Sequence, residues 1–370
     1  MLDRFDDYPI HQVPEPVRHT GSGDRNHYDR YFLNGYTRDG SVFFAIALGL
    51  YPNRRIMDAS VSIVRAGQQY ALHASRLAPL ERGELSVGPI SIEVLEPMRT
   101  LRVRVRPNEH RLEANLIFKA RTSAVEEPRF VNRVDGNVVM DSTRFTQFGC
   151  WEGWLAIADD RVELDPAEVL GCRDRSWGIR PIGEREAGPP GSAPQFFWLW
   201  GPMNFEDSCT HFGVNEFADG RRWHASGCTL PVIAADESPT EEAGVVRMAS
   251  VTHRVRWQPG TRRAASARLT LSPHRGEDLI VDLEPILTFQ MLGLGYLHFE
   301  WGHGHWKGEE VVGFESWSPA DLDPLGLQNI HVQQLCRARM GDREGIGVFE
   351  QLVLGPHQPS GFEELLDGAS

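Results

Sequence analysis

Hydrophobic and polar residues alternate over many short stretches of this chain, which is the pattern of strands with one buried face. In the first half, the alternating or densely apolar stretches are 41–50, 60–64, 69–73, 89–95, 101–106 and 112–120. In the second half, they are 196–200, 210–217, 222–230, 253–257, 267–271, 279–283, 308–317 and 346–354. Gly, Pro, Asn and Asp residues separate the stretches, so we expect many short antiparallel strands.

Turn and helix signals agree with a chain built from strands. The pairs Asp39-Gly40 and Asp219-Gly220 are typical of tight hairpin turns. Helical patterns are scarce, and only 166–169 and 319–325 predict a turn or two of helix. Many strands with few helices predict an all-β protein made of antiparallel barrels or sandwiches.

The length of the chain predicts two domains. Its 370 residues suffice for two domains of about 150 residues each. The segment 182–194 lies near the midpoint and contains three Pro and three Gly, which is typical of a linker. We therefore expect an N-terminal β domain over 1–190 and a C-terminal β domain over 191–370.

Composition and charge exclude several classes of protein. With 41% hydrophobic and 24% charged residues, the chain is not mainly disordered. The net charge of -13 repels phosphate backbones, so we expect no nucleic-acid partner. No run of about 18 apolar residues predicts a membrane segment, and the acidic start lacks a signal-peptide pattern. The five cysteines include no C-x-x-C pair, so we expect reduced thiols in a cytoplasmic protein.

The segment 171–180 is the most distinctive stretch, because it is dense in charge and lacks a strand period. Asp174 stands between Arg173 and Arg175, and two adjacent guanidiniums are expected to lower the pKa of its carboxyl. One hypothesis is a structural clamp, in which Asp174 pairs with Arg173, Arg175 or Arg180. The other is a catalytic base, or an anion that faces a developing cation. Trp177 is predicted to stack on a ligand or on Arg180, or to pack in the core.

This segment resembles the G-x-x-D-x-(S/N)-W-G signature of a family of two-domain, lipocalin-like proteins. That family includes carotenoid 1,2-hydratases (hydroxyneurosporene synthases), an AttH-type group of bacterial proteins and some fungal Diels–Alder cyclases. The sequence departs from the pattern at Arg175, where many members have His. The resemblance implies two tandem lipocalin-like antiparallel β-barrel or sandwich domains with few short helices. It also implies hydration, dehydration, isomerisation or cyclisation of an isoprenoid-like or polyketide-like substrate without a redox cofactor.

A second group of polar residues lies between Tyr296 and Glu310. On a strand, Tyr296, His298 and Glu300 would share one face, and His303 and His305 would share a face. The spacing of His303, His305 and Glu309 also matches the two imidazoles and the carboxylate of a cupin metal site. A cupin-like metal-dependent enzyme is therefore an alternative, although Leu297 stands where the cupin motif has Gly. The simpler interpretation is a polar strand whose His and Glu side chains satisfy one another.

A third group surrounds His211, which shares a predicted strand face with Asn215, while Glu216 takes the other face. Such a His–carboxylate pair is able to act as general acid and base, and an exposed strand face explains the same residues equally well. An acid that stays protonated at pH 7 needs an apolar setting, which favours Glu216 or Glu300 over Asp174. His331 and Glu350, near the C-terminus, are weaker candidates of the same kind.

We expect an enzyme, a lyase or isomerase, that acts by acid–base chemistry on a hydrophobic small molecule in a β-barrel cavity. No cofactor and no metal ligand are expected, and a homodimer is one candidate assembly. The main alternative is a non-catalytic lipocalin-like carrier of an apolar molecule. The candidate catalytic residues are Asp174, Tyr296, His298, His211 and Glu216. All ten Trp lie at or after Trp151, and the candidate ligand-binding residues are Trp177, Arg180, Trp200, Trp223 and Trp301.

Overall fold

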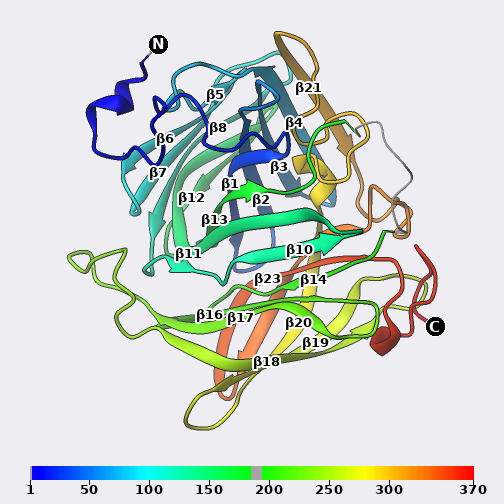
Figure 1. Ribbon diagram of the computed structural model, residues 1–370. Helices are drawn as coiled ribbons and strands as arrows, with labels where there is room; N and C mark the ends of the chain where they lie inside the picture. Colours follow the sequence, from blue (N-terminus) through cyan, green and yellow to red (C-terminus); the bar gives the residue numbers. More distant parts are fainter. Residues whose placement is uncertain (1, 185–193) are drawn as a thin grey trace.

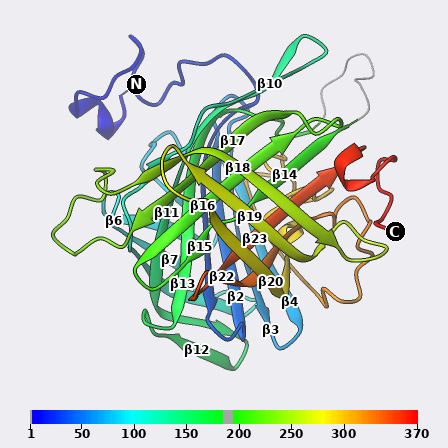
Figure 2. The same cartoon turned by 90° about the horizontal axis from the view of Figure 1, so that it is seen from below.

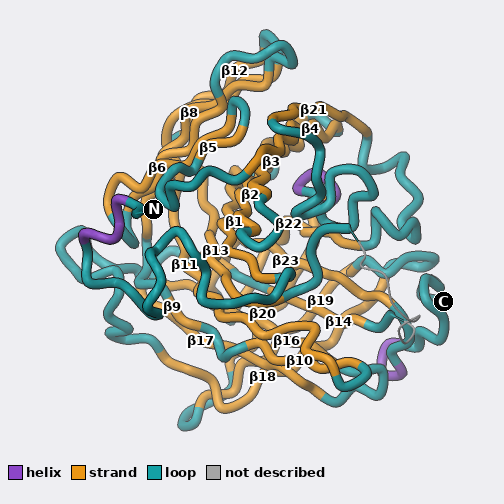
Figure 3. The backbone as a smooth tube through the Cα atoms, turned by 45° about the horizontal axis from the view of Figure 1, so that its top comes forward, coloured by secondary structure: helices purple, strands orange, loops and turns teal. Residues whose placement is uncertain are grey.

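The computed structural model describes residues 2–184 and 194–370, and strands dominate both parts (Figure 3). The helices are three short 3-10 turns, η1 (Arg4–Asp7), η2 (Met291–Leu294) and η3 (Gln358–Ser360). Neither 166–169 nor 319–325 forms a helix. The first segment makes a single turn, in which the N–H groups of Glu168 and Val169 donate to the carbonyl of Asp165, and the second forms turns. The prediction of an all-β protein with few short helices is confirmed.

The first sheet contains 14 strands and makes the upper body in Figure 1. Its main path runs in the order β21-β4-β3-β2-β1-β13-β11-β8-β7-β6-β5, and β9, β10 and β12 pair with the long strand β11. The strands are β1 (His27–Thr37), β2 (Val42–Tyr51), β3 (Ile56–Arg65), β4 (Gln68–Leu77), β5 (Ser86–Val87), β6 (Ile90–Glu96), β7 (Thr100–Val105), β8 (Leu112–Ala120), β9 (Val125–Glu126), β10 (Phe130–Val134), β11 (Asn137–Ile157), β12 (Asp160–Leu164), β13 (Val169–Ile179) and β21 (Glu310–Trp317).

The second sheet contains nine strands, and Figure 2 shows them crossing the first sheet when the molecule is seen from below. Beyond the order β14-β16-β15-β23-β22-β20-β19-β18-β17, β14 pairs with β23 and β16 pairs with β17, which closes the sheet into a barrel. The strands are β14 (Phe196–Trp200), β15 (Met203–Asn204), β16 (Ser208–Glu216), β17 (Arg222–Pro231), β18 (Val246–Trp257), β19 (Ala264–Pro273), β20 (Leu279–Gln290), β22 (His331–Met340) and β23 (Arg343–Leu354).

Three apolar layers result from the two faces of each sheet. One core lies inside the first sheet and includes Leu33, Phe44 and Trp151. Another lies inside the second barrel and includes Leu199 and Phe212. A third core joins the outer faces of both sheets. It includes Phe32 of the first sheet, and Leu335 and Ile346 of strands β22 and β23 in the second. The two barrels therefore form one body with a shared layer between them.

The predicted hairpins at Asp39-Gly40 and Asp219-Gly220 are confirmed. They join β1 to β2 and β16 to β17, and both glycines have the left-handed backbone that such turns favour, with φ of 73° and 81°. The predicted linker over 182–194 lies largely outside the described residues, as does the boundary at 190. In Figure 1 the orange β21 lies beside the blue β4, so a strand from the second half of the sequence completes one edge of the first sheet.

The segment 171–180 has no strand period in its sequence, yet most of it lies in β13, which pairs with β1 on one side and with β11 on the other. The polar group from Tyr296 to Glu309 was placed on a strand, but it follows η2 as an irregular loop that leads into β21. The left-handed backbone of Gly295 and Leu297 prevents an extended strand there.

The five cysteines all lie among the described residues and are free thiols, as predicted. Among the described residues, no helix has both the length and the apolar character needed to cross a membrane.

Candidate active site

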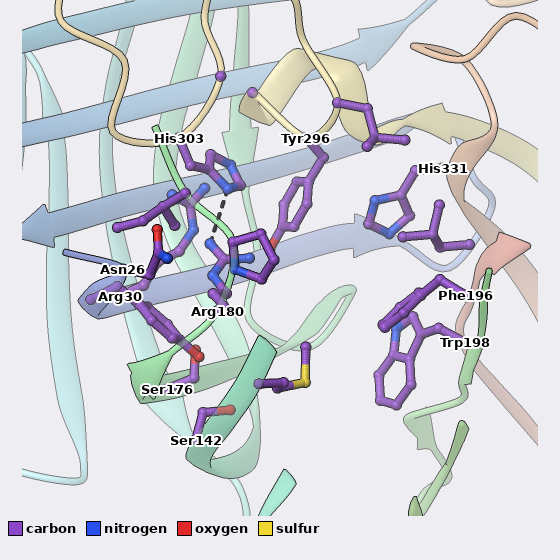
Figure 4. Close-up of a pocket in the computed structure, with 18 of the residues that line it drawn as sticks. Asn26, Arg30, Ser142, Ser176, Arg180, Phe196, Trp198, Tyr296, His303 and His331 are labelled. Atoms are coloured by element: carbon purple, nitrogen blue, oxygen red, sulfur yellow. Dashed lines mark hydrogen bonds between the residues drawn. The ribbon is translucent and has the colours of Figure 1, made fainter. Parts of the chain in front are cut away.

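A cavity of about 690 Å³ lies between the outer faces of the two sheets (Figure 4). We expected a pocket inside a barrel, whereas this cavity lies outside the two interiors, which contain large apolar side chains. Strands β1, β11, β13, β14, β22 and β23 and the loop after η2 contribute to its wall. The apolar lining includes Phe130, Met140, Phe196, Trp198, Leu352 and Leu354, and the polar lining includes Asn26, Arg30, Arg144, Asp174, Arg180, Tyr296, His298, His303, His331 and Glu350.

Asp174 lies in the middle of β13, opposite Phe32 of β1 and Thr146 of β11. Its carboxyl faces the cavity, whereas Arg173 and Arg175 point to the opposite face, because successive side chains of a strand alternate. Arg173 donates to Gln147 at 2.8 Å, and Arg175 pairs with Asp29. The clamp between Asp174 and its two neighbours is therefore absent among the described ion pairs.

Burial raises the pKa of Asp174 to about 7, and the neighbouring Glu127 and Glu350 carboxylates add to this shift while Arg144 opposes it. The predicted lowering of this pKa is wrong, because the adjacent arginines lie across the strand from the carboxyl. Within the described part of the chain, no hydrogen-bond donor contacts the Asp174 carboxylate, so its charged form is poorly stabilised.

Arg144 forms part of the wall next to Asp174, and Glu127 holds it from behind. Glu127 accepts hydrogen bonds from Arg144 Nε at 2.8 Å and from Arg144 Nη2 at 2.5 Å. The guanidinium lies 4.7 Å from the ring centre of Phe130 and 4.8 Å from that of Trp198. The salt bridge thus fixes a cation against two aromatic faces of the cavity.

Glu350 and His331 form a buried pair on neighbouring strands. His331 Nε2 donates to Glu350 at 2.9 Å, Trp198 Nε1 donates to it at 2.9 Å, and Gln333 Nε2 donates to it at 2.6 Å. Burial alone raises the pKa of Glu350, but these hydrogen bonds outweigh burial and hold it below its usual value. The cavity therefore contains one carboxylate that stays ionised and one that titrates near neutrality.

The loop after η2 brings Tyr296 and His303 over the cavity (Figure 4). Arg180 Nη2 donates to His303 Nδ1 at 2.9 Å, and His303 Nε2 donates to the carbonyl of Leu294 at 2.8 Å. Burial, together with the guanidiniums of Arg30 and Arg180, holds the pKa of His303 well below its usual value. His303 is thus a neutral imidazole with both nitrogens in use.

The alternative of a cupin-like metal site at His303, His305 and Glu309 has no support among the described residues, since His303 is committed to Arg180 and Leu294 and Glu309 lies outside the cavity lining. The group in the described residues that brings possible metal ligands together is His73, His298 and Glu315, whose ligand atoms lie within 4.8 Å of one another.

The protonation of His298 does not fit a metal at this second group. Its Nδ1 accepts hydrogen bonds from the backbone N–H of Glu300 and of Trp301, both at 3.0 Å. The ring proton must therefore lie on Nε2, which donates to Glu315 at 2.8 Å, so no lone pair remains for a metal. The hydrogen bond from His298, followed by the one from His73, holds the pKa of the Glu315 carboxyl below its usual value. The group anchors the loop to β21.

A family model matches residues 2–363 of the chain and is described as a family of unknown function (DUF8625). The chain belongs to this family. Among curated proteins, no sequence matches that of this DUF8625 protein.

Solved structures share the fold of this DUF8625 protein at low sequence identity. A putative AttH protein of Nitrosomonas europaea is 12% identical, with a TM-score of 0.58 over 94% of this chain and 98% of that chain. CghA, solved with Sch210972, is 10% identical, with a TM-score of 0.51 over 89% of each chain. Kievitone hydratase of Nectria haematococca is 12% identical over 88% of each chain, with a TM-score of 0.49. The predicted likeness to the AttH-type group is thus found at the level of the fold.

The structure brings four of the predicted site residues of this DUF8625 protein together. Asp174, Arg180, Tyr296 and His298 all line the cavity. His211 and Glu216 do not. His211 lies buried 3.5 Å from Glu127, behind Arg144.

The prediction that Glu216 suits the role of a protonated acid is wrong. Its carboxylate contacts His253 at 3.1 Å, His357 at 3.0 Å and Arg222 at 3.3 Å. Although burial favours the neutral acid, these hydrogen bonds outweigh it and hold the pKa of Glu216 far below its usual value. Glu216 therefore belongs to an ionic network of the second barrel.

The four tryptophans predicted to bind ligand lie outside the cavity lining of the DUF8625 protein. Trp177 is 42% exposed, Trp200 is buried in the layer between the sheets, Trp223 packs near Phe196, and Trp301 stacks on His73. Trp198 is the tryptophan that sequence reasoning missed, together with Arg30 and Arg144. The alternation along β14 was its signal, because residues 196, 198 and 200 share one face.

Proposed function

We propose that this protein is an enzyme that uses acid–base chemistry on a hydrophobic small molecule in the cavity between its two sheets. The reaction class is hydration or dehydration, or isomerisation or cyclisation, of an isoprenoid-like or polyketide-like substrate. The observation that carries this proposal is Asp174, a carboxyl with a pKa raised to about 7 in a cavity with apolar and aromatic walls. A general acid works best when its pKa lies near the working pH.

In the acid step, Asp174 donates its proton to an alkene carbon or to a hydroxyl group that leaves as water. The substrate becomes a carbocation, and the Asp174 carboxylate remains beside it. The ionised carboxylate of Glu350 lines the same space and favours a positive charge there.

In the second step, water adds to the cation, or the cation loses a proton from a neighbouring carbon. The ionised carboxylate of Glu350 in the cavity wall supplies a base for this proton. Glu350 then releases the proton to solvent, and Asp174 takes up a proton from solvent, which closes the cycle. Support for a ligand in this fold comes from CghA, whose structure contains Sch210972.

The test is turnover of a panel of polyprenyl alcohols, alkenes and polyene ketones in D2O, followed by mass spectrometry. We expect deuterium incorporation or a gain or loss of water with the wild-type protein. Asp174→Asn should lower the rate by about 10²–10⁴-fold, the usual contribution of a general acid. The exposed Asp219→Asn is the matched control and should retain full rate.

Two outcomes would overturn the proposal. One is an Asp174→Asn variant that folds and turns over substrate at the wild-type rate. The other is tight binding of panel compounds, independent of pH and without any product, which would identify a carrier of apolar molecules instead.

A further inference from the structure

The cavity has one cationic end and one apolar end. Figure 4 shows Arg30, Arg180 and Asn26 on one side, and Phe196 and Trp198 on the other. A substrate that is apolar throughout would leave the cationic end without a partner. The charges at this end therefore carry information about the substrate.

Three of the four cavity arginines already have a carboxylate partner. Arg144 is paired with Glu127, and Arg54 lies 3.8 Å from Glu184. Arg30 lies 3.4 Å from Asp58 and also donates to the hydroxyl of Tyr51 at 2.8 Å. The positive charges of these three are largely balanced by the protein itself.

Arg180 is different, because its contacts are with neutral groups. It donates to His303 at 2.9 Å, and its guanidinium lies 4.7 Å from the ring centre of Tyr28 and 5.7 Å from that of Tyr296. Over residues 2–184 and 194–370, no carboxylate lies within ion-pair distance of Arg180, and its buried Nε has no hydrogen-bond partner. The neutral state of His303 means that this contact orients the guanidinium without offsetting its charge.

We propose that the substrate is an amphiphilic carboxylate, whose carboxylate group binds Arg180 and whose hydrocarbon part lies against Phe196 and Trp198. A guanidinium presents paired donors that match a carboxylate, and the bond is strong where water is partly excluded. The ring faces of Tyr28 and Tyr296 hold the guanidinium in place, so little side-chain freedom is lost on binding. This inference deepens the proposed function and rests on it for the reaction, while the binding claim is tested separately.

The test compares dodecanoate with 1-dodecanol, two probes with the same chain length, by isothermal titration at pH 8. We expect the wild-type protein to bind dodecanoate roughly tenfold or more tightly than the alcohol. Arg180→Met should weaken dodecanoate binding by about 10–100-fold and leave dodecanol binding nearly unchanged. Arg180→Lys keeps the charge and should recover part of the preference for the acid. The exposed Arg221→Met is the matched control and should behave as wild type.

Equal affinity of the wild-type protein for the acid and the alcohol would overturn the inference. An equal loss of affinity for both probes in a folded Arg180→Met protein would also overturn it, since it would show that Arg180 has a packing role alone. If thermal unfolding shows that Arg180→Met does not fold, the acid preference of Arg180→Lys decides the question.

Asp174→Asn separates this inference from the proposed function. Asp174→Asn should lower turnover by about 10²–10⁴-fold and still prefer dodecanoate to dodecanol. A variant that keeps turnover contradicts the acid role of Asp174 and leaves the affinity comparison valid.

Discussion

At the scale of single residues, hydrogen-bond donors decide the charge of the two cavity carboxyls. Asp174 and Glu350 face the same cavity, and burial raises the pKa of both. Glu350 accepts from His331, Trp198 and Gln333, and its pKa ends below the usual value. Asp174 has no such donors within the described residues, and its pKa reaches about 7. Two carboxyl groups in one cavity therefore take different roles, Asp174 as an acid and Glu350 as an anion.

The raised pKa of Asp174 predicts a pH-dependent cost to stability. The folded pKa of about 7 lies above the ordinary value of 3.8, so the folded state holds a proton that the unfolded state releases. The contribution of Asp174 to the free energy of unfolding therefore falls as pH rises from about 4 to 7. Asp174→Asn should be more stable than wild type at pH 8, by on the order of 2–4 kcal/mol, and about equal at pH 4.

Urea unfolding of both proteins at pH 4, 6 and 8 measures this difference. A variant less stable than wild type by the same amount at every pH would contradict the assignment of Asp174 as a destabilised buried acid.

At the scale of elements, each wall strand has two faces that meet different cores. Along β1, Leu33 packs inside the first sheet, whereas Arg30 and Phe32 face the second barrel. The alternation of apolar residues with solvent-exposed polar residues revealed β6, β7 and β8 from the sequence. It did not reveal β1, β13 and β22, because strands buried on both faces need not alternate. The motif around Asp174 pointed to the correct residue, but only the strand shows that Arg173 and Arg175 lie on its other side.

The network around Glu216 ties β16 to β18 and to the segment before η3. Its pKa is held below the usual value of 4.5, so it contributes stability above about pH 4.5 that is lost as pH falls. Glu216→Gln should lower the free energy of unfolding by about 1–3 kcal/mol at pH 7 and by less at pH 4. Its affinity for cavity probes should stay unchanged.

Thermal and urea unfolding test the Glu216 prediction, with Glu242→Gln of the exposed pair with Arg247 as the control. An undiminished stability of Glu216→Gln at pH 7 would show that the network is not stabilising.

At the scale of the whole molecule, the cavity is a product of docking two barrels. Its wall takes Arg30 from β1, Asp174 from β13, Trp198 from β14 and Glu350 from β23. No stretch of sequence contains more than a part of this set, and the pairing of distant strands leaves no local signal. The sequence was informative about strands and about one motif, and it was silent about which faces of two barrels meet.

The shared layer between the barrels predicts that both unfold together. Phe289 of β20 is fully buried there, and its ring centre lies 4.8 Å from that of Phe43 of β2. Phe289→Ala should cost about 3–5 kcal/mol, because it opens a cavity in a layer to which both sheets contribute. The matched control is Phe299→Ala, whose side chain is 69% exposed and whose loss should change stability little.

Calorimetry and hydrogen exchange of both halves measure this coupling. One transition that moves to lower temperature in Phe289→Ala, with faster exchange in the first and second sheets alike, is the expected result. Two separate transitions, with only the second sheet affected, would mean that the barrels are independent. In that case the cavity between them would open without unfolding either barrel, and its geometry would depend on docking alone. A single transition means instead that the same apolar layer that stabilises the fold also fixes the distance between the acid on β13 and the anion on β23.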